Sequence, residues 1–118
     1  MRFNQPSLDT GGLSALGRPA GSAAMQGHAR LANLHTPVLH THDRFGRRVD
    51  EVEFHPSYHV LLRTALHNRL HGSPWSAGGP THVERAAGFM LFTELEPSVL
   101  CLVSMTYAVA PALRANAA

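Results

Sequence analysis

The histidines are the residues of this chain whose spacing comes closest to a chemical site. Nine are present in 118 residues, and several form close pairs. The pairs are His40 with His42, His55 with His59, and His67 with His71. In the second and third pairs the spacing is H-x-x-x-H, which places both imidazoles on one side of a helix and can hold a zinc ion.

The surroundings of these pairs argue against a zinc site. Pro56 is expected to begin a helix, so His55 and His59 lie on either side of a helix start. Arg63 lies on the same helical ridge as His59 and His67, where its cation repels a metal ion. No cysteine or carboxylate completes a set of four ligands, and no H-E-x-x-H is present. We assign no metal ligand and predict structural or surface roles for the histidines, with a His-rich metal-binding module as an alternative.

A second group of charged residues lies between the first two histidine pairs. Its members are Arg44, Arg47 and Arg48 with the acids Asp43, Asp50, Glu51 and Glu53. A surface that binds nucleic acid gathers its basic residues on one face, whereas acids interleave with the arginines here. The net charge of the chain is only +2 with neutral histidines. We therefore predict a solvated or interface ion-pair network and no nucleic-acid site.

Cys101 is the candidate nucleophile, because it is the single thiol of the chain. Its apolar neighbours, in the run V-L-C-L-V, predict a buried, protonated and inert thiol. One thiol forms no internal disulfide, which fits a reducing cytoplasm. Glu94 and Glu96 have no acid or base partner nearby in the sequence, and neither G-x-G-x-x-G nor G-x-S-x-G is present. We assign no catalytic residue and no cofactor-binding residue.

Two amphipathic helices are expected to form the centre of the fold. A proline at the first position, followed by apolar residues at i, i+3, i+4, i+7 and i+8, predicts a helix over residues 56–71. Thr81 and Glu84 form a capping box, which begins a second helix over residues 81–96. Pro97 ends this helix. Together the two segments predict a helical hairpin.

The remaining segments are expected to surround this hairpin. Residues 98–113 predict a third apolar helix that is broken at Pro111. Residues 20–33 favour a helix, although they contain two glycines, and the loop that follows is expected to be extended over residues 49–54. Residues 1–19 are rich in glycine and proline and predict an irregular, flexible N-terminal arm. The predicted fold class is therefore all-α.

Composition favours a piece of a larger assembly. The chain is 44% hydrophobic and only 15% charged, which is low in charge for a free-standing surface. In the helix over residues 81–96, Phe89 and Phe92 lie opposite the other apolar residues, so this helix is apolar on two sides. Three short helices do not easily bury both sides. No segment reaches the about 20 apolar residues that a membrane span requires, and we expect no membrane anchor.

Two blocks of sequence are specific enough to indicate a family. They are GRRVDEVEFHP at residues 46–56 and SMTYA at residues 104–108. Weaker blocks are FNQP at residues 3–6, ARLAN at residues 29–33, Trp75, and ERAAGFML at residues 84–91. In order and spacing these blocks resemble the N-terminal region of the AidB-like adaptive-response proteins, a branch of the acyl-CoA dehydrogenase flavoproteins.

The resemblance implies a helical N-terminal domain that is followed by a β-barrel-like middle domain and a C-terminal helical bundle. Members of the family bind FAD, act or descend as acyl-CoA dehydrogenases, form homotetramers, and are associated with DNA alkylation damage and duplex DNA. The segments for flavin binding, catalysis and DNA binding lie downstream of the region that matches. The resemblance therefore implies no cofactor in this chain, and FAD and DNA binding only in an intact parent protein.

These considerations predict three parts of the chain. Residues 1–19 are the flexible N-terminal arm, residues 20–113 are an AidB-like N-terminal helical domain, and residues 114–118 are a short tail after a truncation of the reading frame. The expected role is structural, in contact with a homo-oligomer or with the remainder of the parent protein, in the cytoplasm. A stand-alone interaction module is the other alternative. Met105 and Thr106 belong to a matching block, but we assign neither to a flavin pocket.

Overall fold

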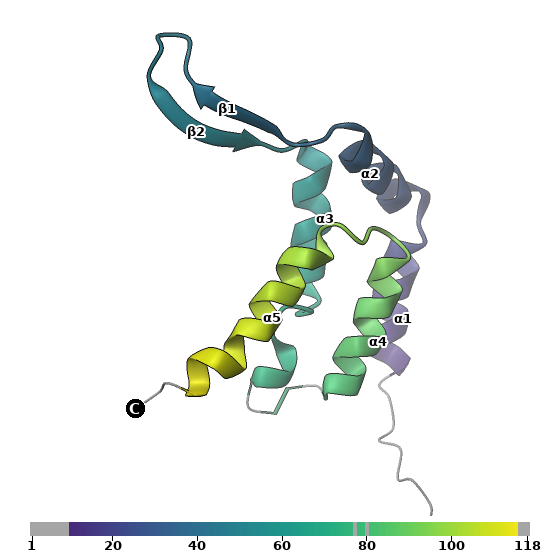
Figure 1. Cartoon of the computed structure of the whole chain (residues 1–118). Helices are drawn as coiled ribbons and strands as arrows, with labels where there is room; N and C mark the ends of the chain where they lie inside the picture. The colour runs from purple at the N-terminus through teal and green to yellow at the C-terminus, as the bar shows by residue number, and fades with distance from the viewer. Residues whose placement is uncertain (1–9, 77, 80, 116–118) are drawn as a thin grey trace, which may run out of the picture.

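The chain folds into a helical body from which one β-hairpin projects (Figure 1). The computed structural model describes residues 10–76, 78–79 and 81–115. The elements are α1 (Thr10–Ala20), α2 (Ala23–Leu34), β1 (Val38–His42), β2 (Arg48–Glu53), α3 (Pro56–His67), a 3-10 turn η1 (Ser73–Trp75), α4 (His82–Thr93) and α5 (Leu100–Ala115). The predominantly helical class is confirmed, and the two-stranded hairpin is an addition to it.

Helix α1 corrects the expectation of an irregular arm over residues 1–19. Residues 10–20 are helical, and residues 1–9 lie outside the described part of the chain. The helix forms against α4, where Leu16 is buried. A Cβ atom on Gly88 would lie 3.1 Å from the Leu70 side chain and 3.5 Å from the Leu16 side chain, so Gly88 lies at a closely packed point beside α1. This tertiary contact outweighs the weak helix propensity of a segment that is rich in glycine.

Helix α2 confirms the helix expected over residues 20–33, with a later start. Gly21 and Ser22 separate it from α1, and the backbone N–H of Met25 donates to the Ser22 hydroxyl oxygen over 3.3 Å. The Ser22 side chain thus satisfies one of the N–H groups that have no partner at a helix start. Figure 1 shows α2 beside the upper end of α3, against which it packs.

The β-hairpin replaces most of the loop expected between α2 and α3. Its strands are antiparallel, and Leu39 lies opposite Val52, and His40 opposite Glu51. Strand β2 confirms the extended conformation expected near residues 49–54. The partner strand β1 was not expected, because its sequence V-L-H-T-H has no clear alternation and no side of it is buried.

A tight turn over residues 43–47 closes the hairpin. The Asp43 carboxylate accepts from the backbone N–H groups of Phe45 over 2.8 Å and of Arg47 over 2.9 Å. Gly46 has a φ of 80°, a backbone conformation that glycine adopts without steric cost. The sequence D-R-F-G therefore specifies the turn locally, although its role in a hairpin becomes clear only from the pairing of the strands.

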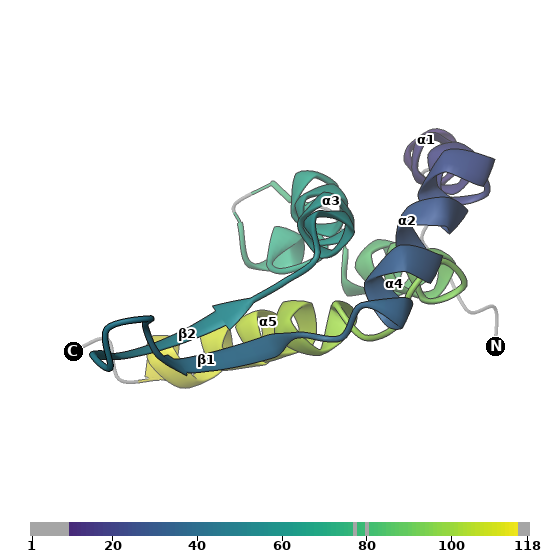
Figure 2. The ribbon, with the colours of Figure 1, turned by 90° about the horizontal axis from the view of Figure 1, so that it is seen from above.

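The two helices of the expected hairpin are present as α3 and α4. The capping box is confirmed, since the Thr81 hydroxyl oxygen accepts from the Glu84 N–H over 3.2 Å and the Glu84 carboxylate accepts from the Thr81 N–H over 2.6 Å. Their packing differs from a simple helical hairpin. The main partner of α3 is α2 and the main partner of α4 is α1. Figure 2 shows the helices from above, with α1, α2 and α4 grouped together and α3 beside them.

Helix α5 continues through Pro111, where the sequence predicts a break. A proline has no N–H to donate to the carbonyl of the residue four positions earlier, which here is Tyr107. The Tyr107 carbonyl accepts instead from the indole N–H of Trp75 over 2.9 Å. A side chain from η1 thus replaces the missing helical hydrogen bond, and the helix runs on to Ala115.

The core is a single cluster to which all five helices contribute buried side chains. Its largest fully buried apolar side chains are Leu61, Phe92, Val99 and Val103. Tyr58, Leu62 and Phe89 pack around them. Within the described residues, no helix is both long and apolar enough to cross a membrane.

Candidate functional site

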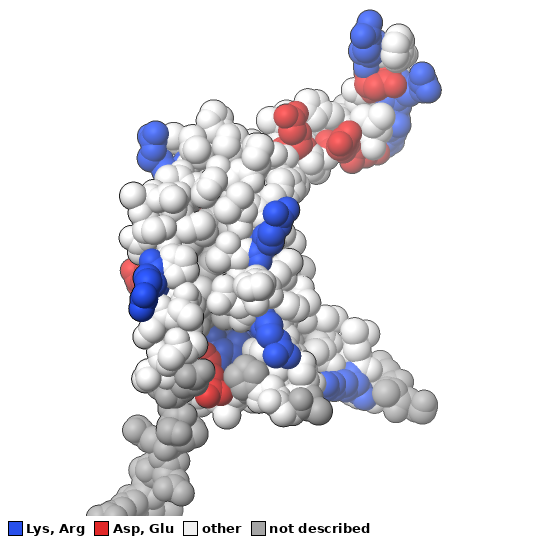
Figure 3. Space-filling model, turned by 180° about the vertical axis from the view of Figure 1, so that it is seen from behind, with Lys and Arg blue, Asp and Glu red and all other residues white. Residues whose placement is uncertain are grey.

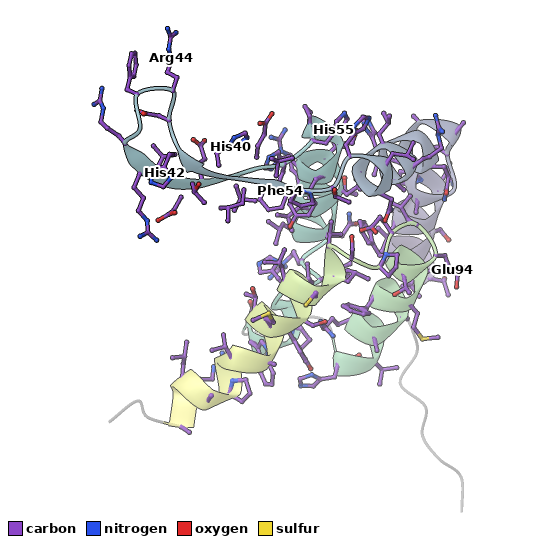
Figure 4. The ribbon with its side chains drawn as sticks, turned by 45° about the horizontal axis from the view of Figure 1, so that its top comes forward. His40, His42, Arg44, Phe54, His55 and Glu94 are labelled. Carbon is purple, nitrogen blue, oxygen red and sulfur yellow. The ribbon has the colours of Figure 1, made fainter. Side chains whose placement is uncertain are left out.

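The histidines of the hairpin are exposed and lie along its strands. Figure 4 shows His40 and His42 between the base of the hairpin and Arg44 at its tip. The His40 imidazole pairs with the Glu53 carboxylate over 2.7 Å, and His42 contacts the Thr41 hydroxyl over 3.1 Å. These contacts are local links within the hairpin.

The histidines around the start of α3 have structural contacts. The His55 imidazole accepts from the backbone N–H of Ser57 over 3.2 Å, which caps α3. The His55 ring also stacks on His35, with 4.7 Å between the ring centroids. His59 lies edge-on to Phe54, with 5.9 Å between centroids. Both His55 and His59 thus contact residues around the start of α3.

The last histidine pair is divided between two environments. His67 is exposed at the end of α3, whereas His71 is partly buried in the turn that follows. In the described part of the chain, no group of three or more His, Cys, Asp and Glu side chains could hold a metal ion.

The arginine cluster forms the tip of the hairpin. Arg47 pairs with Asp43 over 3.6 Å and Arg48 with Asp50 over 2.6 Å, so the predicted ion-pair network is present. Arg44 lies over the ring of Phe45, at 5.0 Å from its centroid. Figure 3 shows these blue groups at the far end of the hairpin with a red group among them, and further red carboxylates towards its base.

Cys101 is exposed, and the prediction of a buried thiol is wrong. The apolar run that contains it forms α5, which buries only one side, through Leu100 and Val103. The other side faces outward. A run of apolar residues predicts burial, but it does not show which side of the helix packs within this domain and which side stays exposed.

The outward side of α5 is an exposed apolar surface, which we call the α5 outer face. It consists of Leu102, Met105, Val109 and Leu113, which recur at helical spacing. Residues 97–113 contain no charged side chain. Exposed apolar patches of this kind, without charges among them, are typical of surfaces that a partner covers.

Glu96, for which the sequence offered no acid or base partner, is a buried carboxylate, and only 1% of it is exposed. It accepts from the Ser98 hydroxyl over 2.7 Å and from the Val99 backbone N–H over 3.0 Å. The Ser98 backbone N–H and the Asn33 amide donate to it as well, over 3.1 and 3.3 Å. Burial alone raises the pKa of Glu96, but these hydrogen bonds outweigh it and hold the pKa below its usual value. The carboxylate thereby joins α2 to the segment that begins α5.

A cluster of aromatic and cationic side chains joins η1, α4 and α5. Arg85 lies 3.7 Å from the Tyr107 ring centroid and donates to the Leu70 carbonyl over 2.7 Å. Burial lowers the pKa of Arg85 from its ordinary value. The Tyr107 hydroxyl and His82 also form a hydrogen bond, and Trp75 packs against both rings. The residues of the cluster are far apart in the sequence, so no local motif predicts it.

Thr106 lines a shallow cavity of about 340 Å³ with Arg69, His71 and Trp75, whereas Met105 points outward on the α5 outer face. A wide, open cavity of about 570 Å³ lies between α1 and α4. Its one charged residue is Arg18, which offers a single contact for a pyrophosphate.

Comparisons with known proteins identify the family of this chain. The family model described as the adaptive response protein AidB N-terminal domain matches residues 1–118. AidB of Escherichia coli (strain K12), a candidate acyl-CoA dehydrogenase, is 39% identical over 107 residues, which cover 89% of this chain and 20% of AidB. The chain thus spans about a fifth of the length of this relative. The chain belongs to the AidB N-terminal domain family.

Proposed function

We propose that this chain contributes structure, and no dehydrogenase chemistry of its own, to an AidB-type protein. The observation that carries the proposal is the α5 outer face, where four large apolar side chains are exposed on a helix side without charge. Burying such a surface contributes about 25 cal/mol per Å² of apolar area removed from water. A surface of this composition is suited to stable packing against another domain.

The proposed occupant of the α5 outer face is the part of an AidB-type protein that lies downstream of the matched region. In such an intact protein, we propose, the downstream part binds FAD, carries the acyl-CoA dehydrogenase-type chemistry and contacts DNA, within a cytoplasmic response to DNA alkylation. The support for this assignment is the family membership and the match to one fifth of Escherichia coli AidB. The present chain supplies packing and oligomer contacts.

A chimaera tests the proposal. The chain replaces the corresponding N-terminal segment of Escherichia coli AidB, and both the chimaera and the 118-residue chain are incubated with FAD and desalted. We expect the chain alone to be colourless and the chimaera to keep a flavin absorption band. A flavin band on the chain alone would contradict the proposal, because the cofactor site would then lie within it.

Two methionines provide a matched pair of variants. Met105 on the α5 outer face and Met90 on α4 are 66% and 70% exposed. We expect Met105→Glu to place a charge in the covered interface, and so to reduce soluble, flavin-loaded chimaera, because a buried unpaired charge is costly. Met90→Glu is expected to have little effect. Equal effects of the two substitutions would mean that the α5 outer face is not the contact surface.

A further inference from the structure

A stacked pair of histidines joins the β-hairpin to the helical body. His35 is the C-cap residue of α2, and His55 is the N-cap residue of α3, directly after the hairpin. Their ring centroids lie 4.7 Å apart, with 12° between the ring planes. Figure 4 shows His55 where the hairpin meets the helices. The side chain of His55 thus lies at the junction of α2, the hairpin and α3.

The imidazole of His55 has a fixed role as a hydrogen-bond acceptor. Its Nδ1 atom accepts from the backbone N–H of Ser57 over 3.2 Å. A backbone N–H can only donate, so Nδ1 has to be without a proton for this bond to form. The bond satisfies one of the N–H groups that have no partner within the first turn of a helix. A proton on Nδ1 therefore removes the side-chain cap of α3.

The other histidine hydrogen bonds do not depend on a neutral ring. Three of them involve hydroxyl groups, which both donate and accept, namely His28 with Ser57, His42 with Thr41 and His82 with Tyr107. A fourth joins His40 to the Glu53 carboxylate, and a positive charge on the ring strengthens it. Among the histidine hydrogen bonds of the described residues, the bond from Ser57 to His55 is thus the one that a proton breaks.

The ionisable groups around His55 offer little to neutralise a charge on it. They are His28 and His35 on α2, His59 on α3 and Glu53 at the end of β2. Glu53 is the one carboxylate of this group, and it already pairs with His40. A charged His55 also faces the second imidazole of the stack and the positive end of the α3 dipole. His35 is exposed and His55 is half-buried, so protons from water reach the stack.

We propose that His55 is a pH-sensitive joint, in which a proton on the imidazole removes the cap of α3, separates the His35–His55 stack and loosens the base of the hairpin. Histidine side chains commonly change charge between about pH 5 and 8. The cap requires the neutral ring, so it is present at the upper end of this range and is lost as the pH falls. This device goes beyond the proposed function and does not depend on the α5 outer face.

Nuclear magnetic resonance on the 118-residue chain tests the proposal. The ring ¹⁵N shifts of His55 report its protonation, and the protection factor of the Ser57 amide reports the cap, corrected for the intrinsic pH dependence of exchange. We expect this protection factor to fall about tenfold between about pH 8 and 5, the effect of losing one N-cap. The amide of Phe92 in the core is expected to keep its protection.

Substitutions at the two ends of α3 provide the matched variants. Asparagine and serine cap helices without taking up a proton in this range, so His55→Asn and His55→Ser should fold and keep the Ser57 amide equally protected at both pH values. His67→Asn changes an exposed histidine at the other end of α3 and should behave as the wild type. His35→Phe keeps a ring in the stack without its charge, and we expect a smaller fall in protection.

Three results would overturn the proposal. The first is a His55 ring that stays neutral down to about pH 5. The second is a protonated His55 beside a Ser57 amide that remains protected. The third is a loss of protection that extends equally to Phe92 or that persists in His55→Asn, because general unfolding would then be its cause. None of these results affects the flavin test on the chimaera.

Discussion

The helical body and the β-hairpin (residues 38–53), which is called the arm below, use charged side chains in opposite ways. In the body, Glu96 is buried and accepts hydrogen bonds from several donors, which fixes where α5 begins. In the arm, the Arg48 guanidinium and the Asp50 carboxylate lie 2.6 Å apart, yet both side chains are exposed. An exposed ion pair is screened by water and contributes little, whereas a buried carboxylate with its full set of donors is costly to disturb.

This contrast suggests that the body provides the stability of the fold, whereas the arm provides a surface for contact with a partner. The body owes its stability to a small core around Phe92 and Val99 and to the hydrogen bonds of Glu96. The arm has no side chain in that core, so its charges and apolar groups are available to a partner. The predictions below test whether this division of roles is real.

The largest effect is expected in the core of the body. Phe92 is fully buried, and Phe92→Ala removes its ring and leaves a cavity. We expect the free energy of unfolding to fall by about 3–5 kcal/mol. Urea denaturation followed by circular dichroism measures this change, with Phe45→Ala in the arm as the matched control. A loss below about 1 kcal/mol would mean that the core described above does not hold the body together.

The buried carboxylate is expected to have the next largest effect. Glu96→Gln weakens the charge-assisted hydrogen bonds, and we expect a loss of about 2 kcal/mol at neutral pH. The folded-state pKa of Glu96 lies below its usual 4.5, so its stabilisation is complete above that value and is lost as the pH falls through the folded-state pKa. The wild type and the variant should therefore converge in stability in acid. A difference that stays constant with pH would contradict this role.

A smaller effect is expected where Trp75 supports α5. Trp75→Phe keeps a ring but removes the N–H that the Tyr107 carbonyl accepts. We expect a loss of about 1–2 kcal/mol, because a partly buried carbonyl remains without its donor. Amide hydrogen exchange should increase mainly near Pro111, on the C-terminal half of α5. Exchange that increases equally along the whole chain would indicate general unfolding instead.

The smallest effect is expected in the arm. Arg48→Ala removes the ion pair with Asp50. We expect the free energy of unfolding to change by less than about 1 kcal/mol, because the pair is exposed. The measurement is made at a protein concentration where the chain is monomeric, so that self-association does not contribute. A larger loss would show that the arm and the body are one cooperative unit.

The sequence predicted the elements whose signals are local. The proline start of α3 and the capping box of α4 are each encoded within a few residues, and both are confirmed. The expected ion pairs at Arg47 and Arg48 are also present, because their partners are close in the sequence. Local chemistry of this kind depends little on the rest of the fold.

The sequence did not predict the features that depend on distant partners. Helix α1 packs against the distant helix α4, and α5 passes Pro111 because Trp75 replaces a hydrogen bond. Glu96 needs Asn33 from α2. A single sequence does not show which distant residues meet. The same limit explains Cys101, whose apolar neighbours pack on one side of α5 only.

Hydrogen–deuterium exchange on the isolated chain and on the chimaera with Escherichia coli AidB tests the central claim most directly. The claim is that this domain presents surfaces that the rest of an AidB-type protein covers. We predict that the amides of α5 around Met105 and Val109 become markedly more protected in the chimaera, while those of the core around Leu61 change little. Equal protection of α5 in both proteins would contradict the account.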